Sequence, residues 1–162
     1  MKQPSQLLFD LLKSFESCKL TAYDDGTGHF TIGYGSAYLP NGSRIKEGDT
    51  CTLEQAQEYL IFHLRGLIDH LNATIPDSLA QGQFDALLDF CYNAGEGAWN
   101  SSSLKVSVNS DPLNFNKITA DFKKWDKVHR YGIFIVSRGL LRRRKCEAYL
   151  YKNGVNAPNF LA

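Results

Sequence analysis

Two carboxylates with different expected surroundings lie close together near the start of the 162-residue chain. Glu16 comes at the end of an apolar helical stripe, where partial desolvation and the negative end of the helix dipole would both raise its pKa. Asp25 lies in an Asp-Asp-Gly turn, where solvent should keep it ionised. A protonated acid beside an ionised carboxylate is what general acid–base hydrolysis of a glycosidic bond requires.

Thr31 lies six residues after Asp25. It belongs to a run of alternating aromatic, β-branched and small residues that predicts a β-ribbon over 23–35. Its hydroxyl could both donate to and accept from a water molecule beside Asp25. Many helix–turn–strand segments contain a Glu and an Asp, so the pair alone would also fit two solvated surface carboxylates.

The whole segment from Phe15 to Gly35 closely resembles the active-site segment of the phage-type lysozymes. These are the endolysins of glycoside hydrolase family 24, which include the T-even and lambdoid phage muramidases. In their pattern a Glu is followed after eight residues by an Asp and after five more by a Thr, then by Ile-Gly-x-Gly. Glu16, Asp25 and Thr31 match all three positions and both spacings.

Three later segments are similar to further parts of the same family, in the same order. Residues 48–57 resemble the start of its long interlobe helix, 83–95 its helix ending in Tyr-Asn-x-Gly, and 139–150 its late Gly-Leu-x-x-Arg-Arg-x-x-Glu-x-x-Leu helix. The resemblance therefore covers most of the chain from about residue 8 to 151.

The resemblance implies an enzyme that cleaves the β-1,4 bond between N-acetylmuramic acid and N-acetylglucosamine in peptidoglycan. Glu16 would be the general acid, Asp25 would hold or activate the attacking water, and Thr31 would help to position it. The family is generally taken as inverting, which fits a base set back far enough to leave room for water. A lytic transglycosylase would not need the Asp–Thr water site, and no cofactor is expected.

The elements that must position these residues predict an α+β fold in a single domain over 1–162, and the resemblance implies that this fold is lysozyme-like. Apolar spacing and capping signals predict helices over 4–15, 53–72, 76 to about 93, 101–108, 112–128 and 138–152. Thr52 and Gln55 should form a capping box before the second of these helices. The resemblance further implies that the helix 53–72 joins a small β-ribbon lobe of about 17–52 to a larger helical lobe of about 1–16 and 74–162, with the glycan in the cleft between the lobes.

Five further residues near expected element ends are candidates for contact with sugar or for lining the cleft, and four of them have a plainer alternative. Tyr34 and Gly35 follow the ribbon, although Gly35 also suits a turn. Tyr92 and Asn93 end a helix, where Tyr92 could instead pack between lobes and Asn93 could be only a C-cap. Trp99 could line the cleft but suits a core position equally well.

The run from Arg142 to Lys145 is the densest group of basic residues. Four consecutive charges on a helix cannot share one face, so one should point inward to a carboxylate and the others should face solvent. The resemblance implies that an arginine of this helix pairs with Glu16 or supports the cleft. Arg142 and Arg143 are therefore both substrate-binding candidates.

The net charge of +1 averages two unlike parts of the chain. Residues 1–116 hold 7 basic and 14 acidic side chains, whereas residues 117–162 hold 11 basic and 3 acidic ones. Such asymmetry indicates either internal pairing or an anionic partner. Attraction of the 142–145 run to an anionic cell envelope is one such use. Binding of nucleic acid is not expected, because a solvated face is a much stronger explanation of that run.

Metal and disulfide chemistry have weak signals. His63 and His70 are seven residues apart without an evident third ligand, so no metal site is predicted. The cysteines are scattered without a CxxC pair, which predicts free, buried or partly buried thiols, with one disulfide formed after export left open. They are Cys18, Cys51, Cys91 and Cys146.

The chain shows neither a signal peptide nor an apolar run long enough to span a membrane, so no membrane anchor is expected. We expect a monomer made in the host cytoplasm, released with the help of a holin, and acting on peptidoglycan strands at the cell wall or in the periplasm. Two alternatives stay open: a secreted antibacterial effector with the same chemistry, and a catalytically silent glycan-binding module. The intact Glu16, Asp25 and Thr31 argue against the silent module.

Overall fold

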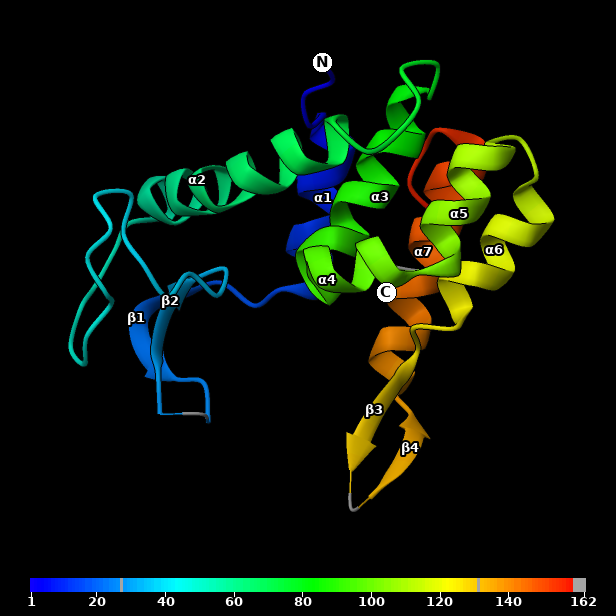
Figure 1. The fold of residues 1–162 in the computed structure, drawn as a ribbon. Coiled ribbons are helices and arrows are strands. Elements are labelled where there is room, and N and C mark those ends of the chain that lie inside the picture. The colour runs from blue at the N-terminus through cyan, green and yellow to red at the C-terminus, as the bar shows by residue number, and fades with distance from the viewer. Residues whose placement is uncertain (27, 131, 159–162) are drawn as a thin grey trace. The chain divides into compact units, whose positions relative to one another are not determined.

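The computed structural model describes residues 1–26, 28–130 and 132–158, and it divides into two compact units (Figure 1). One unit is the continuous stretch Leu12–Gly66, and the other combines Met1–Leu11 with Leu67–Ala162. The first unit is therefore inserted in the sequence of the second. Thr27, in the predicted turn, lies outside the described residues.

The unit 12–66 contains the predicted β-ribbon. Strands β1 (Lys19–Asp24) and β2 (Phe30–Gly33) pair antiparallel, with an irregularity between Lys19 and Tyr23. Isolated bridges then join the following loop to the ribbon and to itself: Thr21 to Thr50, Ile32 to Ser36 and Tyr38 to Arg44. The predicted ribbon is confirmed, although its first strand begins at Lys19 and not at Tyr23.

Helix α2 spans Leu53–Asn72, as predicted. The N–H of Thr52 donates to Oε1 of Gln55 at 2.9 Å, and the N–H of Gln55 donates to Oγ1 of Thr52 at 3.2 Å, which is the expected capping box. Ala56 of α2 is fully buried, and a Cβ on Gly33 would lie 3.0 Å from the Cβ of Ala56. The end of β2 therefore packs directly against α2 because position 33 has no side chain.

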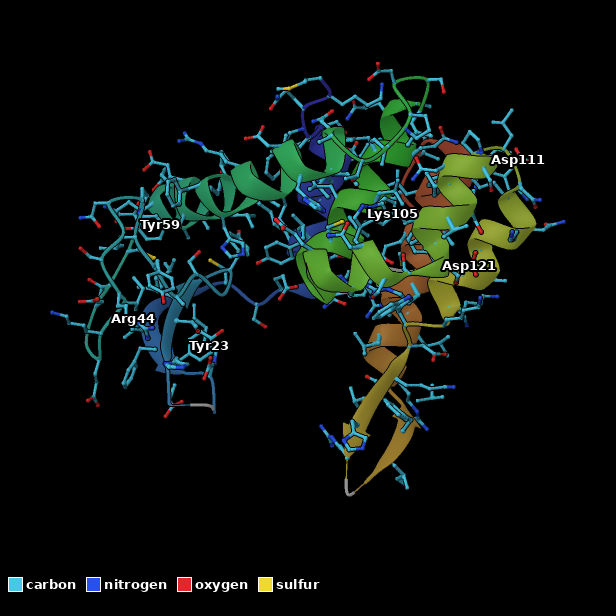
Figure 2. The ribbon with its side chains drawn as sticks, viewed as in Figure 1. Tyr23, Arg44, Tyr59, Lys105, Asp111 and Asp121 are labelled. Carbon is cyan, nitrogen blue, oxygen red and sulfur yellow. The ribbon has the colours of Figure 1, made fainter. Side chains whose placement is uncertain are left out.

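The other unit is mainly helical. Its elements are α1 (Gln6–Phe15, whose last turn belongs to the unit 12–66), α3 (Gln81–Ala94), α4 (Glu96–Ser101), α5 (Ser103–Ser110), α6 (Phe115–Lys123), β3 (Lys127–Arg130), β4 (Ile133–Val136) and α7 (Arg138–Asn153). Helix α3 is buried from Gly82 to Cys91 and packs against α7. Asp121 of α6, labelled in Figure 2, accepts from Ser103 and Ser107 of α5 at 2.8 and 2.6 Å, which ties those two helices together.

The two ends of the chain meet within this unit. Oγ of Ser5 and its N–H both donate to the buried carboxylate of Asp85 on α3. Nδ2 of Asn156, beyond α7, donates to the carbonyl of Leu7 at 3.0 Å, across 149 positions of sequence. The first helix is thus held in place by the middle and the end of the chain.

Three predicted helices differ from the observed ones in their bounds or their number. Helix α3 begins at Gln81 and not at Pro76, because Gln83 caps it by accepting from the N–H of Ala80 at 2.7 Å. Ser102 separates two short helices where one was predicted. The helix predicted over 112–128 ends at Lys123, and a second hairpin, β3–β4, follows it. The β-branched and aromatic residues of β4 favour a strand there.

Two further predictions concern membrane spans and thiols. None of the helices in the described part of the chain combines the length and the apolar character that crossing a bilayer demands. All four cysteines are free thiols; Cys18 is partly exposed and the other three are buried, as predicted.

Candidate active site

The β1–β2 ribbon places Asp25 and Thr31 on one face. Asp24 pairs with Phe30, and Tyr23 with Thr31. The N–H of Asp25 then donates to the carbonyl of His29 at 3.0 Å, which extends the same register by one pair. Because alternate residues of a strand share a face, Asp25 and Thr31 are diagonal neighbours on that face.

The hydroxyl of Thr31 is buried and forms no hydrogen bond with the described residues. The residue is 6% exposed, and its Oγ1 has no hydrogen-bond partner among the described residues. An unpaired buried hydroxyl costs about 1–3 kcal/mol, so such groups usually have a functional or structural reason. Asp25 beside it is exposed. A water molecule held against Asp25 could complete the hydrogen bonding of Thr31.

Glu16 stands directly after α1 in the same unit. Its N–H donates to the carbonyl of Leu12 at 2.9 Å, so the helical hydrogen bonding continues to this residue. Glu16 is half-buried, whereas Asp25 is exposed. The two carboxylates therefore occupy different environments, as an acid and a base with divided roles would need. Those roles remain predictions.

Tyr34 and Gly35 form the tight turn after β2. The backbone groups of Ile32 and Ser36 exchange hydrogen bonds of 3.0 and 2.9 Å across it, and Gly35 has a φ of +90°. Gly35 is thus required by the turn. Tyr34 is buried, and its burial together with the nearby Cys18 thiol raises the pKa of its hydroxyl. Tyr34 packs under the ribbon, and sugar contact by either residue stays a prediction.

Tyr23 was not singled out from the sequence. It lies on β1 directly opposite Thr31 (labelled in Figure 2), and Nζ of Lys19 stands 3.9 Å from its ring centroid. This cation–π contact braces the strand that leads to Asp25. The signal available in the sequence was the spacing, since Tyr23 lies two residues before Asp25 and hence on its face of the ribbon.

The remaining candidates belong to the other unit and surround a buried group of charges. Nε and Nη2 of Arg143 donate to the two carboxylate oxygens of Asp89, both at 2.9 Å. Nη2 of Arg144 donates to Glu147 and, at 2.9 Å, to Oδ1 of Asn93. All four charged residues are buried. Two consecutive arginines of the 142–145 run therefore point inward, where one was predicted.

The two buried carboxyls of this group respond differently to burial. Burial opposes ionisation of Asp89, but the Arg143 guanidinium outweighs it and lowers the pKa of that carboxyl. Burial raises the pKa of Glu147 well above its usual range, against the pull of Arg144. Neither carboxylate was predicted, although Glu147 follows Arg143 and Arg144 at the i+4 and i+3 spacing of helical partners.

The buried charge group contacts several residues that were predicted to bind substrate, but only some of these residues are accessible to solvent. Asn93 is exposed and fixed by Arg144, and the ring of Tyr92 lies 5.8 Å from the guanidinium carbon of Arg143. Arg142 is half-buried, while Arg143 is committed to Asp89. Trp99 is fully buried and donates to Thr74 at 2.9 Å, so it is a core residue.

The sequence was compared with protein families and with known proteins, and the matches described below agree on one family. The model of the family described as phage lysozyme matches residues 13–147. The endolysin of Bacillus phage PZA is 36% identical over 154 residues, covering 94% of this chain and 56% of that protein. The endolysin of Acyrthosiphon pisum secondary endosymbiont phage 1 is 31% identical over 143 residues, covering 88% and 93%. The chain thus spans little more than half the length of the first relative and nearly all of the second.

Solved structures agree with this grouping. The endolysin from Escherichia coli O157:H7 phage FAHEc1 superposes with a TM-score of 0.88 at 33% identity, covering 97% of this chain and 98% of that one. A mutant of P22 lysozyme superposes with a TM-score of 0.80 at 29% identity, covering 93% and 99%. The predicted lysozyme-like fold class is therefore confirmed.

Proposed function

The chain belongs to the phage lysozyme family, and on this premise we propose that it hydrolyses the β-1,4 bond between N-acetylmuramic acid and N-acetylglucosamine in peptidoglycan. One observation carries the proposal. The buried hydroxyl of Thr31, which has no hydrogen-bond partner among the described residues, shares a ribbon face with the exposed Asp25, in the unit that also holds Glu16. All three residues lie within the stretch matched by the family.

In the proposed reaction, Glu16 donates its proton to the glycosidic oxygen as the bond to the anomeric carbon breaks. A water molecule bound between Asp25 and Thr31 attacks that carbon from the opposite face. Asp25 takes the proton of the attacking water, and Thr31 keeps the water in place. The product is inverted at the anomeric carbon, and the two carboxyls end with their protonation states exchanged.

Analysis of the new chain ends tests this proposal. Purified peptidoglycan is digested and the released fragments are separated and weighed by mass spectrometry. A hydrolase yields reducing N-acetylmuramic acid ends, and we expect these. Anhydro ends would show a transglycosylase, and no release would show a binding module. Proton NMR of the first products, recorded before mutarotation, then reports whether the anomeric configuration is inverted.

We also propose that the protein acts as an endolysin, which is what its relatives from several phages are named. It would be made as a monomer in the host cytoplasm and reach the cell wall through a holin lesion. Expression in Escherichia coli with and without a co-expressed holin tests the delivery step, because lysis should require the holin. Light scattering coupled to size-exclusion chromatography tests the monomer.

A further inference from the structure

The β3–β4 hairpin exposes apolar side chains on both of its faces. Its register pairs Lys127 with Val136, Val128 with Ile135, His129 with Phe134, and Arg130 with Ile133. All of β4 is exposed: Ile133 by 60%, Phe134 by 73%, Ile135 by 40% and Val136 by 50%. Because side chains alternate, the two isoleucines lie on one face and the other two residues on the opposite face.

The two strands of the hairpin differ in polarity. Strand β4 consists of four apolar residues, while β3 carries Lys127, His129 and Arg130, all exposed. Residues 127–138 include three Lys and Arg residues and no Asp or Glu. Figure 1 shows the hairpin projecting away from α6 and α7, the helices that it connects. One long edge is therefore apolar and the other is basic.

This distribution favours a bilayer interface over a groove. A protein groove or a glycan strand covers one face of a ribbon and would leave the other apolar face in water. An interface surrounds an inserted edge from both sides, with hydrocarbon below and head groups above. Anionic head groups complement the basic strand and attract each nearby Lys or Arg.

We propose that the β4 edge of this hairpin inserts into the surface of an anionic phospholipid bilayer. Lys127, Arg130 and the exposed Arg138 then contact lipid phosphates, while Ile133 to Val136 reach the acyl boundary. The attraction to an anionic envelope that the sequence assigned to residues 142–145 thereby moves to the hairpin. Two of those four residues, Arg143 and Arg144, are buried and cannot meet a surface. The proposed catalytic residues all belong to the other unit.

Vesicle flotation tests the proposal with matched variants of the full chain. Vesicles of phosphatidylcholine alone are compared with equal mixtures of phosphatidylcholine and phosphatidylglycerol. We expect binding to the mixed vesicles only, weakened at least tenfold by the double variant I133S/F134S and by K127Q/R130Q. The controls V106S and K117Q change an exposed valine of α5 and an exposed lysine of α6, and they should bind like the wild type.

Insertion is measured separately from adsorption. The F134W variant places a fluorophore on β4, and lipids brominated on their acyl chains should quench it in mixed vesicles more strongly than they quench the wild type. Circular dichroism melts check that every variant is folded. Hydrolysis of purified, lipid-free peptidoglycan should be unchanged in the hairpin variants, so that failure of this proposal is distinguishable from failure of the proposed catalysis.

Several outcomes would overturn the proposal. One is equal binding of both vesicle types, or of the hairpin variants and the controls. Another is a failure of the I133S/F134S variant to co-sediment with lipid-free peptidoglycan when the wild type does, which would show that the hairpin binds the glycan. A wild-type dimer that I133S/F134S dissociates would assign it to a second copy of the chain.

Discussion

The β1–β2 and β3–β4 hairpins are both two-stranded and antiparallel, and each has glycines with positive φ near its turn, but their surroundings differ. Behind the first hairpin stands α2, and Thr31 to Gly33 of β2 are buried. In the second hairpin every residue of β4 is exposed. The first also carries a carboxylate within its turn, whereas the second has none in 127–138.

This contrast shows what a short ribbon needs for each task. A two-stranded ribbon alone is marginally stable in water. Packing on a helix fixes β2 and keeps the Thr31 side chain buried, so that its hydroxyl has a defined direction. The exposed hairpin cannot hold a reactive group so precisely, but its open faces remain available for contact.

The largest expected effect comes from the two proposed catalytic carboxylates, Asp25 in the turn of the first hairpin and Glu16 shortly before the hairpin begins. Glu16→Gln and Asp25→Asn should each lower the rate of peptidoglycan hydrolysis by about 10²–10⁴-fold, because each removes a group that is proposed to transfer a proton. Their melting temperatures should stay near that of the wild type, since both side chains reach solvent. Turbidity loss of purified peptidoglycan measures the rates. Normal hydrolysis by Glu16→Gln would show that another residue is the acid.

The next effect separates activity from stability at Thr31. Thr31→Val keeps the shape of the side chain and removes a hydroxyl that has no protein partner among the described residues, so the free energy of unfolding should change by less than about 1 kcal/mol. Hydrolysis should nevertheless fall roughly 10-fold to 100-fold, because the water loses a partner. Urea unfolding and turbidity assays measure the two changes, with the exposed Thr21→Val on β1 as control. A loss of stability of about 2 kcal/mol or more would show that the hydroxyl has a structural partner in the protein.

A smaller effect compares one glycine from each hairpin. Gly33→Ala should lower the free energy of unfolding by about 1–3 kcal/mol, because its Cβ would press on Ala56 and its φ is +65°. Gly132→Ala meets nothing within 4 Å, so only the strain of a φ of +81° remains, about 1 kcal/mol. Thermal melts of both variants measure the difference. Equal losses would mean that the first hairpin is no more tightly packed than the second.

The smallest expected effect is on the pH dependence of stability, through Tyr34 at the end of the first hairpin. Burial and Cys18 raise the pKa of Tyr34 in the folded state, so the fold favours the protonated phenol. Its contribution to stability is complete below the unfolded pKa of about 10 and is lost as the pH rises through the folded value. Tyr34→Phe should therefore flatten the alkaline decline in melting temperature, by less than the Gly33→Ala shift. The exposed Tyr38→Phe is the control and should leave the decline unchanged.

Features set by neighbours in sequence were predicted well. The Thr52–Gln55 capping box and the bounds of α2 follow from residues within one turn of each other. The pairing of Arg143 with Asp89 joins residues 54 positions apart, and no spacing rule reaches that far. The β3–β4 hairpin escaped prediction for a different reason. Its apolar residues run consecutively along β4, so the alternation typical of a half-buried strand is absent.

The candidate site divides in the same way. The positions of Glu16, Asp25 and Thr31 could be proposed from the family pattern, and their expected surroundings could be argued from the helix end and the turn. The burial of the Thr31 hydroxyl without a partner among the described residues depends on everything packed around β2, including α2, and no sequence motif reports it.

The meeting of the two chain ends has a consequence for how the protein is made. Residues 12–66 form one continuous unit, so they can complete their contacts while the rest of the chain is still being translated. The first helix must wait, because its partners Asp85 and Asn156 emerge from the ribosome much later. The segment with the proposed catalytic groups can thus fold early, while the unit that carries the basic hairpin closes only after Asn156 has been made.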